Sequence, residues 1–321
     1  RQRAFVKIQD GCRYQCTFCV TTRARGAERS RPIAEVCDEI NRLVADGIKE
    51  VVLTGVHAAG YGSDTGSSLD RLLTAVLEDT DVARVRLGSV EPWDLSQRFW
   101  ALFENPRMMP HLHLPVQSGA DSVLKRMARR CRTAEFRRLV SDARASVAGF
   151  NVTTDIIVGF PGETAAEWSQ TLAFVEEVGF GDLHVFSYSR RAGTLAAGMP
   201  DQVPAALKQE RSRALHALGW RLKRRFLEQQ AGSIVPVLIE GFETGSDGKT
   251  QVGYTPSYLL VRIPSLATDR SNQVLPVRLV GVVGDRERRA EDANSRPSSL
   301  LLSGTIADID DAAVTGAVSR T

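Results

Sequence analysis

The sequence predicts an α/β protein with a parallel sheet, followed by a small all-β domain. From residue 4 to about residue 190, short apolar runs alternate with amphipathic segments of helical period, the pattern of repeated β–α units. After Gly232 the runs become strand-like and are separated by turns rich in Gly, Ser and Asp, which is typical of a small barrel. Between the two parts, residues 201–231 have the pattern of a long basic helix.

Six strands and the helices between them are expected in the first part. The helix at 33–46 illustrates the reasoning: Pro32 lies near its start, Gly47 lies past its end, and its apolar side chains share one face. Six β–α units are too few to close an eight-stranded barrel, so periodicity alone leaves an open barrel and a doubly wound sheet equally compatible with the pattern. The expected strands are 4–8, 50–54, 85–89, 111–116, 152–158 and 182–188, and the helices are 33–46, 69–77, 95–104, 120–129, 134–147 and 164–178.

The second part is expected to contain five strands, at 234–239, 251–254, 257–263, 273–283 and 300–306. Residues 285–299 have almost no apolar side chains and are expected to form a mobile loop, and 308–321 a frayed tail. The predicted organisation is therefore a larger domain at 1–231, a β-barrel at 232–307 and a tail at 308–321.

Composition and charge narrow the class of protein. The chain of 321 residues carries a net charge of +3, with the basic excess in the first 231 residues, which permits a nucleic-acid partner without demanding one. An apolar run long enough to span a bilayer and a signal peptide are both lacking, and five scattered cysteines suit a reducing compartment, so a cytoplasmic location is expected. The chain begins with Arg1, and we expect it to be a fragment or a processed protein.

The most informative segment is a CxxxCxxC loop directly after the first predicted strand. Cys12, Cys16 and Cys19 place three thiols on one tight loop, and thiolate is the ligand for Zn²⁺ or an iron–sulfur cluster. Either site normally has four ligands, so a [4Fe–4S] cluster held by three cysteines leaves one iron open to bind a small molecule. A zinc site is the weaker alternative, and the odd number of cysteines argues against disulfides.

Polar and glycine residues follow the carboxyl ends of the predicted strands, the end that carries the site in parallel α/β folds. They are the cysteine loop, Thr54 with Gly55, Ser89 with Glu91, Gln117 with Ser118, the segment 159–163 and the segment 189–191.

These segments resemble, in order, the methylthiotransferase branch of the radical S-adenosylmethionine (SAM) superfamily. The matching stretches are 6–12, 25–26 with 29–31, 113–119, 155–164 and 188–190, and the resemblance covers residues 4–283. It implies an open (βα)6 partial TIM barrel. The β-domain, through 252–255 and 258–261, looks like the RNA-binding TRAM module that closes these proteins.

The resemblance also implies site residues. Cys12, Cys16 and Cys19 would ligate the [4Fe–4S] cluster, whose open iron chelates SAM. The SAM pocket would be lined by Phe18, Gly55, His57, Ser89, Glu91, Gln117, Asp155 and Gly159, with the glycines allowing close approach of the cofactor. RNA phosphates would be contacted by Arg23, Arg25, Arg29, Arg31, Lys223 and Arg224, although a solvated surface is an equal alternative for each.

The remaining histidines and cysteines have simpler interpretations. His57 is either a polar group of the pocket or a histidine at the end of a strand. His113 is expected to be a hydrogen-bonded histidine inside the barrel. Cys37 is expected to be a small buried hydrophobe, and Cys131, among arginines, an exposed thiol without a ligand role.

Residues 53–62 look most like enzymes that methylthiolate C2 of N6-threonylcarbamoyladenosine at tRNA position 37. Sister groups act on N6-isopentenyladenosine at the same position or on an aspartate of a ribosomal protein. Two hypotheses from different classes are a non-catalytic iron–sulfur protein that binds RNA or senses redox state, and a radical-SAM methyltransferase of another kind. The resemblance implies tRNA as partner, a reduced flavodoxin- or ferredoxin-type electron donor, a monomer and no membrane association.

The sequence departs from this family at three points. The family carries an N-terminal domain whose cysteines bind a second [4Fe–4S] cluster, and this chain contains no such domain. That cluster is expected on a segment outside the chain; the alternative is a protein that performs only SAM cleavage. Ser189 and Leu195 stand where the family has prolines, which puts the geometry of one loop in doubt.

Overall fold

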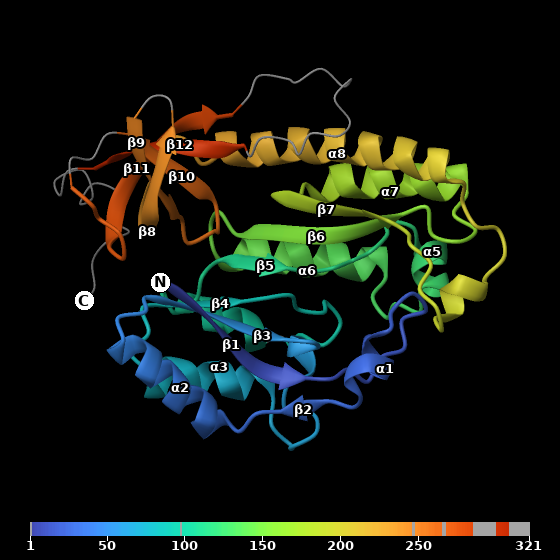
Figure 1. Cartoon of the computed structure of the whole chain (residues 1–321), viewed down its shortest axis with the longest axis horizontal. Coiled ribbons are helices and arrows are strands. Elements are labelled where there is room, and N and C mark those ends of the chain that lie inside the picture. Colours follow the sequence, from blue (N-terminus) through green and yellow to red (C-terminus); the bar gives the residue numbers. More distant parts are fainter. Residues whose placement is uncertain (1, 97, 246–247, 265–267, 285–299, 308–321) are drawn as a thin grey trace.

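A computed structural model describes residues 2–96, 98–245, 248–264, 268–284 and 300–307. Its larger part is a parallel sheet with helices along one face, and its smaller part is a closed β-barrel beside one end of that sheet (Figure 1). The loop and tail predicted at 285–299 and 308–321 lie outside the described residues. No helix of the described segments is long and apolar enough to cross a membrane.

Six parallel strands follow one another in chain order. β1 (Arg3–Asp10), β3 (Glu50–Gly55) and β4 (Arg84–Leu87) form one half, and β5 (His111–His113), β6 (Asn151–Val158) and β7 (Asp182–Ser187) form the other. Single parallel bridges join the halves, at Val85 with Met108 and at Ser89 with His113. The short β2 (Arg29–Ser30) pairs antiparallel with β1, and the described residues show no pairing between β1 and β7, so the barrel is open.

Helices cover the outer face of this sheet. They are α1 (Thr21–Arg25), α2 (Ile33–Ala45), α3 (Leu69–Asp79), α4 (Arg98–Ala101), α5 (Asp121–Arg126), α6 (Thr133–Ser146), α7 (Ala165–Val178) and α8 (Ala205–Glu228), with short 3-10 turns η1 (Ala58–Gly60), η2 (Leu102–Glu104) and η3 (Leu195–Gly198). Side chains alternate along a strand, and those of Val152, Ile156 and Val158 enter the core beneath the helices. Residues 153 and 155 therefore face the inside of the open barrel.

The smaller part is a five-stranded closed barrel in the order β10-β12-β11-β8-β9. Its strands are β8 (Ile234–Gly245), β9 (Gly248–Tyr254), β10 (Leu260–Pro264), β11 (Val274–Val283) and β12 (Leu301–Ile306). It has its own core, to which Trp220, Phe226 and Leu227 of α8 contribute. Because α8 belongs to both parts, the domain boundary at 231 remains a prediction.

A turn of the β-barrel seals the amino end of the sheet. Glu50, fully buried, contacts three arginines near the starts of neighbouring strands: Arg3 at 2.5 Å, Arg84 at 3.1 Å and Arg86 at 3.1 Å. The ring of Tyr258 lies 4.5 Å from the Arg86 guanidinium carbon. The backbone carbonyls of residues 254, 255 and 256 accept hydrogen bonds from Arg84 and Arg86, which ties the two parts together through buried polar contacts.

The structure corrects three expectations. The fourth strand ends at His113, not at residue 116, because Pro115 has no N–H to donate to the ladder. Cys131 is 5% exposed, not an exposed thiol, because it joins the core against which α6 packs, and burial raises its pKa to about 12. The short α1 and β2 were not predicted.

Candidate functional site

The cysteine loop lies between β1 and α1 and is held from several directions. The Cys12 N–H donates to the Gly26 carbonyl at 3.1 Å. The Thr17 N–H and hydroxyl donate to the carbonyls of Met127 and Arg126 at 3.1 and 2.9 Å. The loop is therefore fixed to β1, to α1 and to the end of α5, which places it at the carboxyl end of the sheet.

All three sulfurs have a donor within reach. The Tyr14 N–H lies 3.4 Å from Cys12 Sγ, the Arg129 guanidinium 3.7 Å from Cys16 Sγ, and the Thr21 N–H 3.4 Å from Cys19 Sγ. Such donors stabilise thiolates, the form that ligates metal. Three half-buried or exposed thiols on one anchored loop fit the donor set of a [4Fe–4S] cluster that keeps one iron open.

Arg129 was missed as a site residue in the sequence, although it lies in an arginine-rich segment. It is 8% exposed, lies 4.2 Å above the Trp93 ring and donates to the Pro115 carbonyl. This guanidinium is held beside Cys16 by packing and hydrogen bonding. A fixed guanidinium therefore lies beside this predicted cluster ligand.

His57 is held by buried hydrogen bonds near the cysteine loop, and its role in the cofactor pocket stays a prediction. It is fully buried directly after β3, with Nδ1 2.5 Å from Glu28 and Nε2 2.9 Å from Asp94. Burial alone lowers the pKa of His57, but the hydrogen bond to Asp94 and the carboxylates of Glu91 and Glu28 outweigh it and raise the pKa. The Tyr14 ring lies edge-on at 4.8 Å, so His57 adjoins the cysteine loop.

Glu91 lies beside His57 with one buried carboxylate oxygen free. Its Oε2 lies 3.7 Å from His57 Nε2 and makes no hydrogen bond within the described residues. Burial raises the pKa of Glu91, while His57 and Arg129 oppose the shift. A carboxylate with an unused buried oxygen is suited to accept hydrogen bonds from a cationic amino group.

The two glycines predicted to admit the cofactor are explained here by packing within the protein. A Cβ on Gly159 would lie 2.2 Å from Lys208 Cγ, so this glycine makes room for a side chain of α8. A Cβ on Gly55 would lie 3.0 Å from Gln9 Oε1. Their need for glycine is therefore accounted for without a ligand.

Ser89 and Gln117 follow the carboxyl ends of β4 and β5, one in each half of the sheet. Gln117 has φ +77°, a left-handed conformation unusual for a side-chain-bearing residue, and its backbone bonds to Asp155 and Ile157 of β6. Ser89 forms a bridge with His113 of β5. The strained backbone at Gln117 is consistent with a site at this end.

Asp155 is brought together with two histidines inside the open barrel. His113 Nε2 and His184 Nδ1 both lie 3.1 Å from Asp155 Oδ1. His113 is thus hydrogen-bonded in the barrel interior, as predicted. His184 was missed, although its alternation with apolar residues on the sixth strand could have indicated it.

Phe18 packs edge-on against Phe160 at 6.5 Å and belongs to a small apolar cluster beneath the cysteine loop. Phe18 thus anchors the cysteine loop, of which it is a part, to this apolar cluster. Its predicted contact with the cofactor stays a prediction.

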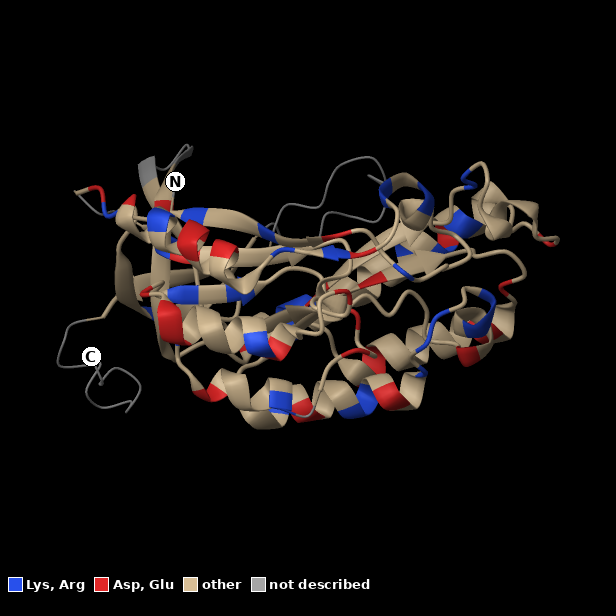
Figure 2. Cartoon of the chain, turned by 90° about the horizontal axis from the view of Figure 1, so that it is seen from below, with Lys and Arg blue, Asp and Glu red and all other residues tan. Residues whose placement is uncertain are grey.

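The six cations predicted to contact RNA differ in how closely they are paired with acidic groups of the protein. Arg31 pairs with Glu39 at 2.6 Å and Lys223 with Asp182 at 2.6 Å, whereas Arg25 and Arg29 are exposed and reach Asp10 only at 3.7 and 3.9 Å. Arg23 donates to the Gly193 carbonyl, and Arg224 is exposed on α8. Figure 2 shows Lys and Arg interspersed with Asp and Glu over the visible helices, so the charge alone does not mark an RNA surface.

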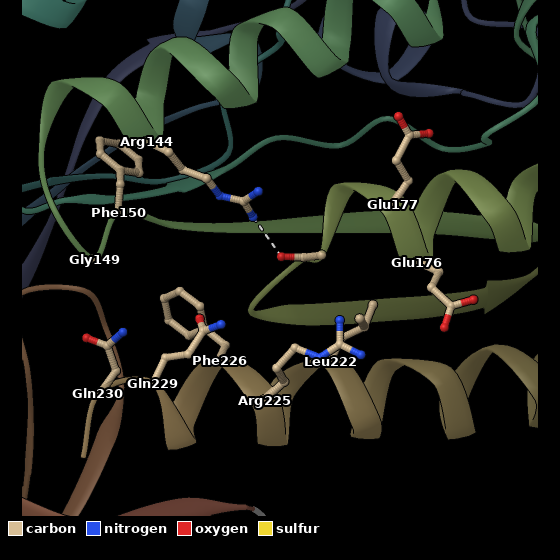
Figure 3. Close-up of a pocket in the computed structure, with 11 residues that line it drawn as sticks. Arg144, Gly149, Phe150, Glu176, Glu177, Leu222, Arg225, Phe226, Gln229 and Gln230 are labelled. Atoms are coloured by element: carbon tan, nitrogen blue, oxygen red, sulfur yellow. Dashed lines mark hydrogen bonds between the residues drawn. The ribbon is translucent and has the colours of Figure 1, made fainter.

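A cavity of about 420 Å³ lies at the other end of the sheet. Figure 3 shows its lining from three helices: Arg144 of α6, Glu176 and Glu177 of α7, and Arg225 with Phe226 of α8. Arg144 is committed to the carbonyls of residues 178 and 179. This cavity is separate from the cysteine loop, because it adjoins the residues that precede β6 and β7.

Comparison with known proteins identifies the family of this chain. The sequence model of the radical SAM superfamily matches residues 6–175. The threonylcarbamoyladenosine tRNA methylthiotransferase MtaB of Thermotoga maritima is 41% identical over 75% of this chain and 56% of its own length, and MtaB of Bacillus subtilis is 39% identical over 81% and 59%. A tRNA-2-methylthio-N(6)-dimethylallyladenosine synthase of Acidothermus cellulolyticus is 38% identical over 93% and 64%. The chain thus spans about three fifths of the length of these relatives.

Two solved structures share the fold. The radical SAM methyltransferase TsrM of Kitasatospora setae, with cobalamin and a [4Fe–4S] cluster bound, superposes with a TM-score of 0.52 at 20% identity over 60% of this chain and 38% of its own. Coproporphyrinogen III oxidase (HemN) of Escherichia coli superposes with a TM-score of 0.50 at 15% identity over 96% of this chain and 72% of its own. The partial barrel inferred from the sequence is therefore the fold of this chain.

Proposed function

Because the chain belongs to the radical SAM superfamily, we propose that it is the catalytic part of a tRNA methylthiotransferase that converts N6-threonylcarbamoyladenosine at position 37 to its 2-methylthio derivative. The observation that carries the proposal is the anchored loop with three donor-supported sulfurs at the carboxyl end of the sheet. Support for the proposed substrate comes from the two relatives named MtaB.

In this proposal Cys12, Cys16 and Cys19 hold the [4Fe–4S] cluster, and a SAM molecule binds its open iron. When bound, the pair supplies a 5′-deoxyadenosyl radical, reactive enough to functionalise an unactivated C–H position. The chain supplies placement: Glu91 offers its free oxygen to the amino group of SAM, and His57 orients the neighbouring carboxylates. Phe18, Gly55, Ser89, Gln117, Asp155 and Gly159 complete the proposed SAM pocket.

The β-barrel is proposed to be a TRAM-like module that binds tRNA. Arg23, Arg25, Arg29 and Arg31 beside the cysteine loop, and Lys223 with Arg224 on α8, are the proposed phosphate contacts. If Arg25 and Arg29 bind phosphates, the double Ala variant weakens tRNA binding across sequences and reduces the salt dependence of log Kd by about one for each arginine that is removed. Arg137→Ala, which removes a cation paired with Glu177 on the opposite helices, is the matched control.

Further partners follow from the same proposal. A reduced flavodoxin- or ferredoxin-type protein would deliver the electron, and the enzyme would act as a cytoplasmic monomer without membrane association. A second [4Fe–4S] cluster would lie on a domain outside this chain, consistent with relatives that are longer than the part matched here.

A second substrate has a specific observation in its favour. The Acidothermus cellulolyticus relative, named for dimethylallyladenosine, matches 93% of this chain. Mass spectrometry of tRNA nucleosides from cells lacking the gene separates the two. Loss of 2-methylthio-N6-threonylcarbamoyladenosine supports the proposal, loss of the dimethylallyl (isopentenyl) counterpart replaces the substrate, and no change in either contradicts tRNA methylthiolation and favours a ribosomal-protein aspartate or another radical reaction.

A further inference from the structure

A cluster of metal-ligating groups lies inside the open barrel, apart from the cysteine loop. It consists of His113 on β5, Asp155 on β6 and His184 on β7, one from each strand of the second half-sheet. Asp155 lies opposite His184 in the parallel register, and His113 lies opposite Thr153, one step toward the amino end on the same face. The ladder therefore brings these three side chains together.

The distances suit one ion. Asp155 Oδ1 lies 3.1 Å from His113 Nε2 and 3.1 Å from His184 Nδ1, and all three ligand atoms lie within 4.8 Å of one another. Three atoms so placed share a point about 2 to 2.5 Å from each, close to the Zn–N and Zn–O bond lengths of about 2.0–2.2 Å. Formation of the site requires shifts of only a few tenths of an ångström.

Thr153 supplies the outer contact that such a site needs. His113 Nδ1 lies 2.9 Å from Thr153 Oγ1, and Nε2 is turned toward the Asp155 carboxylate at 3.1 Å. A bound ion would take the place of a proton between Nε2 and Asp155, while Nδ1 donates to Thr153. Metal-ligating histidines usually donate their second nitrogen in this way, which fixes the ring and its tautomer. The His113 ring is thus already turned with the correct nitrogen toward Asp155.

We propose that His113, Asp155 and His184 form a binding site for one divalent transition ion, such as Zn²⁺ or Fe²⁺, inside the open barrel. Two imidazoles and one carboxylate are a ligand set for such ions, and three protein ligands leave coordination positions open. Leu183 and Val185, the neighbours of His184 on β7, pack against the core beneath the helices, so His184 faces the inside of the barrel. Its side chain is more than half exposed, which leaves the open positions accessible. An oxygen or nitrogen of a molecule that enters the barrel would fill them.

The test measures bound metal in the intact, cluster-loaded chain. The protein is equilibrated anaerobically with Zn²⁺, freed of excess ion and analysed for zinc and iron separately, because iron reports the cluster. We expect about one zinc per chain in the wild type and its loss in His184→Gln and in Asp155→Asn, with iron unchanged. Thr153→Val keeps all ligands and is expected to bind zinc about 10- to 100-fold more weakly.

Two controls make the result specific. His216→Gln removes an exposed histidine of α8 that is hydrogen-bonded to the Ser212 backbone and side chain, and it should keep the zinc. Co²⁺ should give a spectrum of nitrogen and oxygen ligands that disappears in His184→Gln, whereas thiolate ligands would add sulfur-to-cobalt charge-transfer bands.

Equal zinc content in the wild type and in His184→Gln would overturn the proposal, as would a cobalt spectrum with thiolate bands alone. So would a wild type that retains no zinc; if Asp155→Asn then loses SAM binding, Asp155 serves only as the SAM contact of the proposed function.

Discussion

The two ends of the parallel sheet carry charged and polar groups in opposite ways. At the amino end, Glu50, Arg84 and Arg86 are buried, Arg3 is partly buried, and the turn that carries Tyr258 closes over them. At the carboxyl end, the thiols of the cysteine loop are half-buried or exposed and are held by hydrogen bonds that leave the sulfurs accessible. One end uses its polar groups to join two parts of the chain, and the other presents them to ligands.

The pKa values express the same difference. Burial raises the pKa of Glu50, but Arg86, Arg84 and Arg3 outweigh it and lower the pKa to about 2. Burial lowers the pKa of Arg84 to about 10. At the other end, burial shifts the pKa of Glu91 upward, and this carboxylate keeps an oxygen free. Charges at the amino end are compensated by one another, whereas Glu91 at the carboxyl end keeps a buried oxygen without a hydrogen bond within the described residues.

The largest effect is expected from Cys16→Ala. Removing one of three cluster ligands should abolish [4Fe–4S] absorbance and SAM cleavage altogether, while the unfolding midpoint of the cluster-free chain stays unchanged. Cys37→Ala is the control: removing this core thiol of α2 should lower the stability of the chain but leave the cluster absorbance intact. SAM cleavage retained by Cys16→Ala would contradict the functional assignment of the carboxyl end.

Glu50→Gln should show the reverse pattern: lower stability with the cluster absorbance retained. Removing the carboxylate leaves three arginines partly uncompensated in a buried site, and we expect a loss of about 3–5 kcal/mol in the free energy of unfolding measured with urea. Glu176→Gln, in an exposed pair with Arg221 at 3.7 Å, should cost less than about 1 kcal/mol. Similar values for the two variants would show that the amino-end network contributes no more than a surface pair.

Lowering the pH should reduce the difference in the free energy of unfolding between the wild type and Glu50→Gln. The pKa of Glu50 is lowered in the folded chain, so its stabilisation is fully present above the ordinary value of 4.5 and is lost as the pH falls toward about 2. The shift corresponds to a contribution on the order of 3 kcal/mol. Urea unfolding of both proteins across this window measures it, and a constant difference would mean that Glu50 is not the titrating group.

The smallest effect is expected from Asn151→Ala. The Asn151 amide donates to the Ser257 carbonyl at 2.9 Å, and its loss leaves a buried carbonyl unpaired, which costs about 1–2 kcal/mol. Asn41→Ala removes an exposed amide bond to the Asp79 carbonyl and should change stability by less than about 0.5 kcal/mol. Equal losses of stability in Asn151→Ala and Asn41→Ala would show that the hydrogen bond to the Ser257 carbonyl does not help to hold this turn on the sheet.

The elements that could be predicted from sequence were those with a clear period. The strands and helices of the open barrel appear within a few residues of the predicted bounds, because each β–α unit repeats the same alternation. The cysteine loop was found because its spacing is local. α1 and β2 escaped because five and two residues are too few to show a period.

What could not be predicted depends on partners far apart in the chain. The sequence Arg84-Val85-Arg86 places two charges on one face of a fully buried strand, and that pattern signals buried partners without naming them. Glu50 and the turn at Tyr258 become those partners only in the folded chain. The prediction for Cys131 was wrong for the same reason, because its neighbours in sequence are arginines whereas its neighbours in space form a core.

The hydrogen bond between Arg86 and the Pro256 carbonyl spans 170 residues. During translation at about 5–20 residues per second, Arg86 would therefore emerge about 10–35 s before the turn that closes the amino end of the sheet. Until then Glu50 and the arginines remain open to water, and the nascent open barrel of the larger part lacks its full stability. We expect the two parts to mature together, with the β-barrel acting as the last step in folding the sheet as well as a module in its own right.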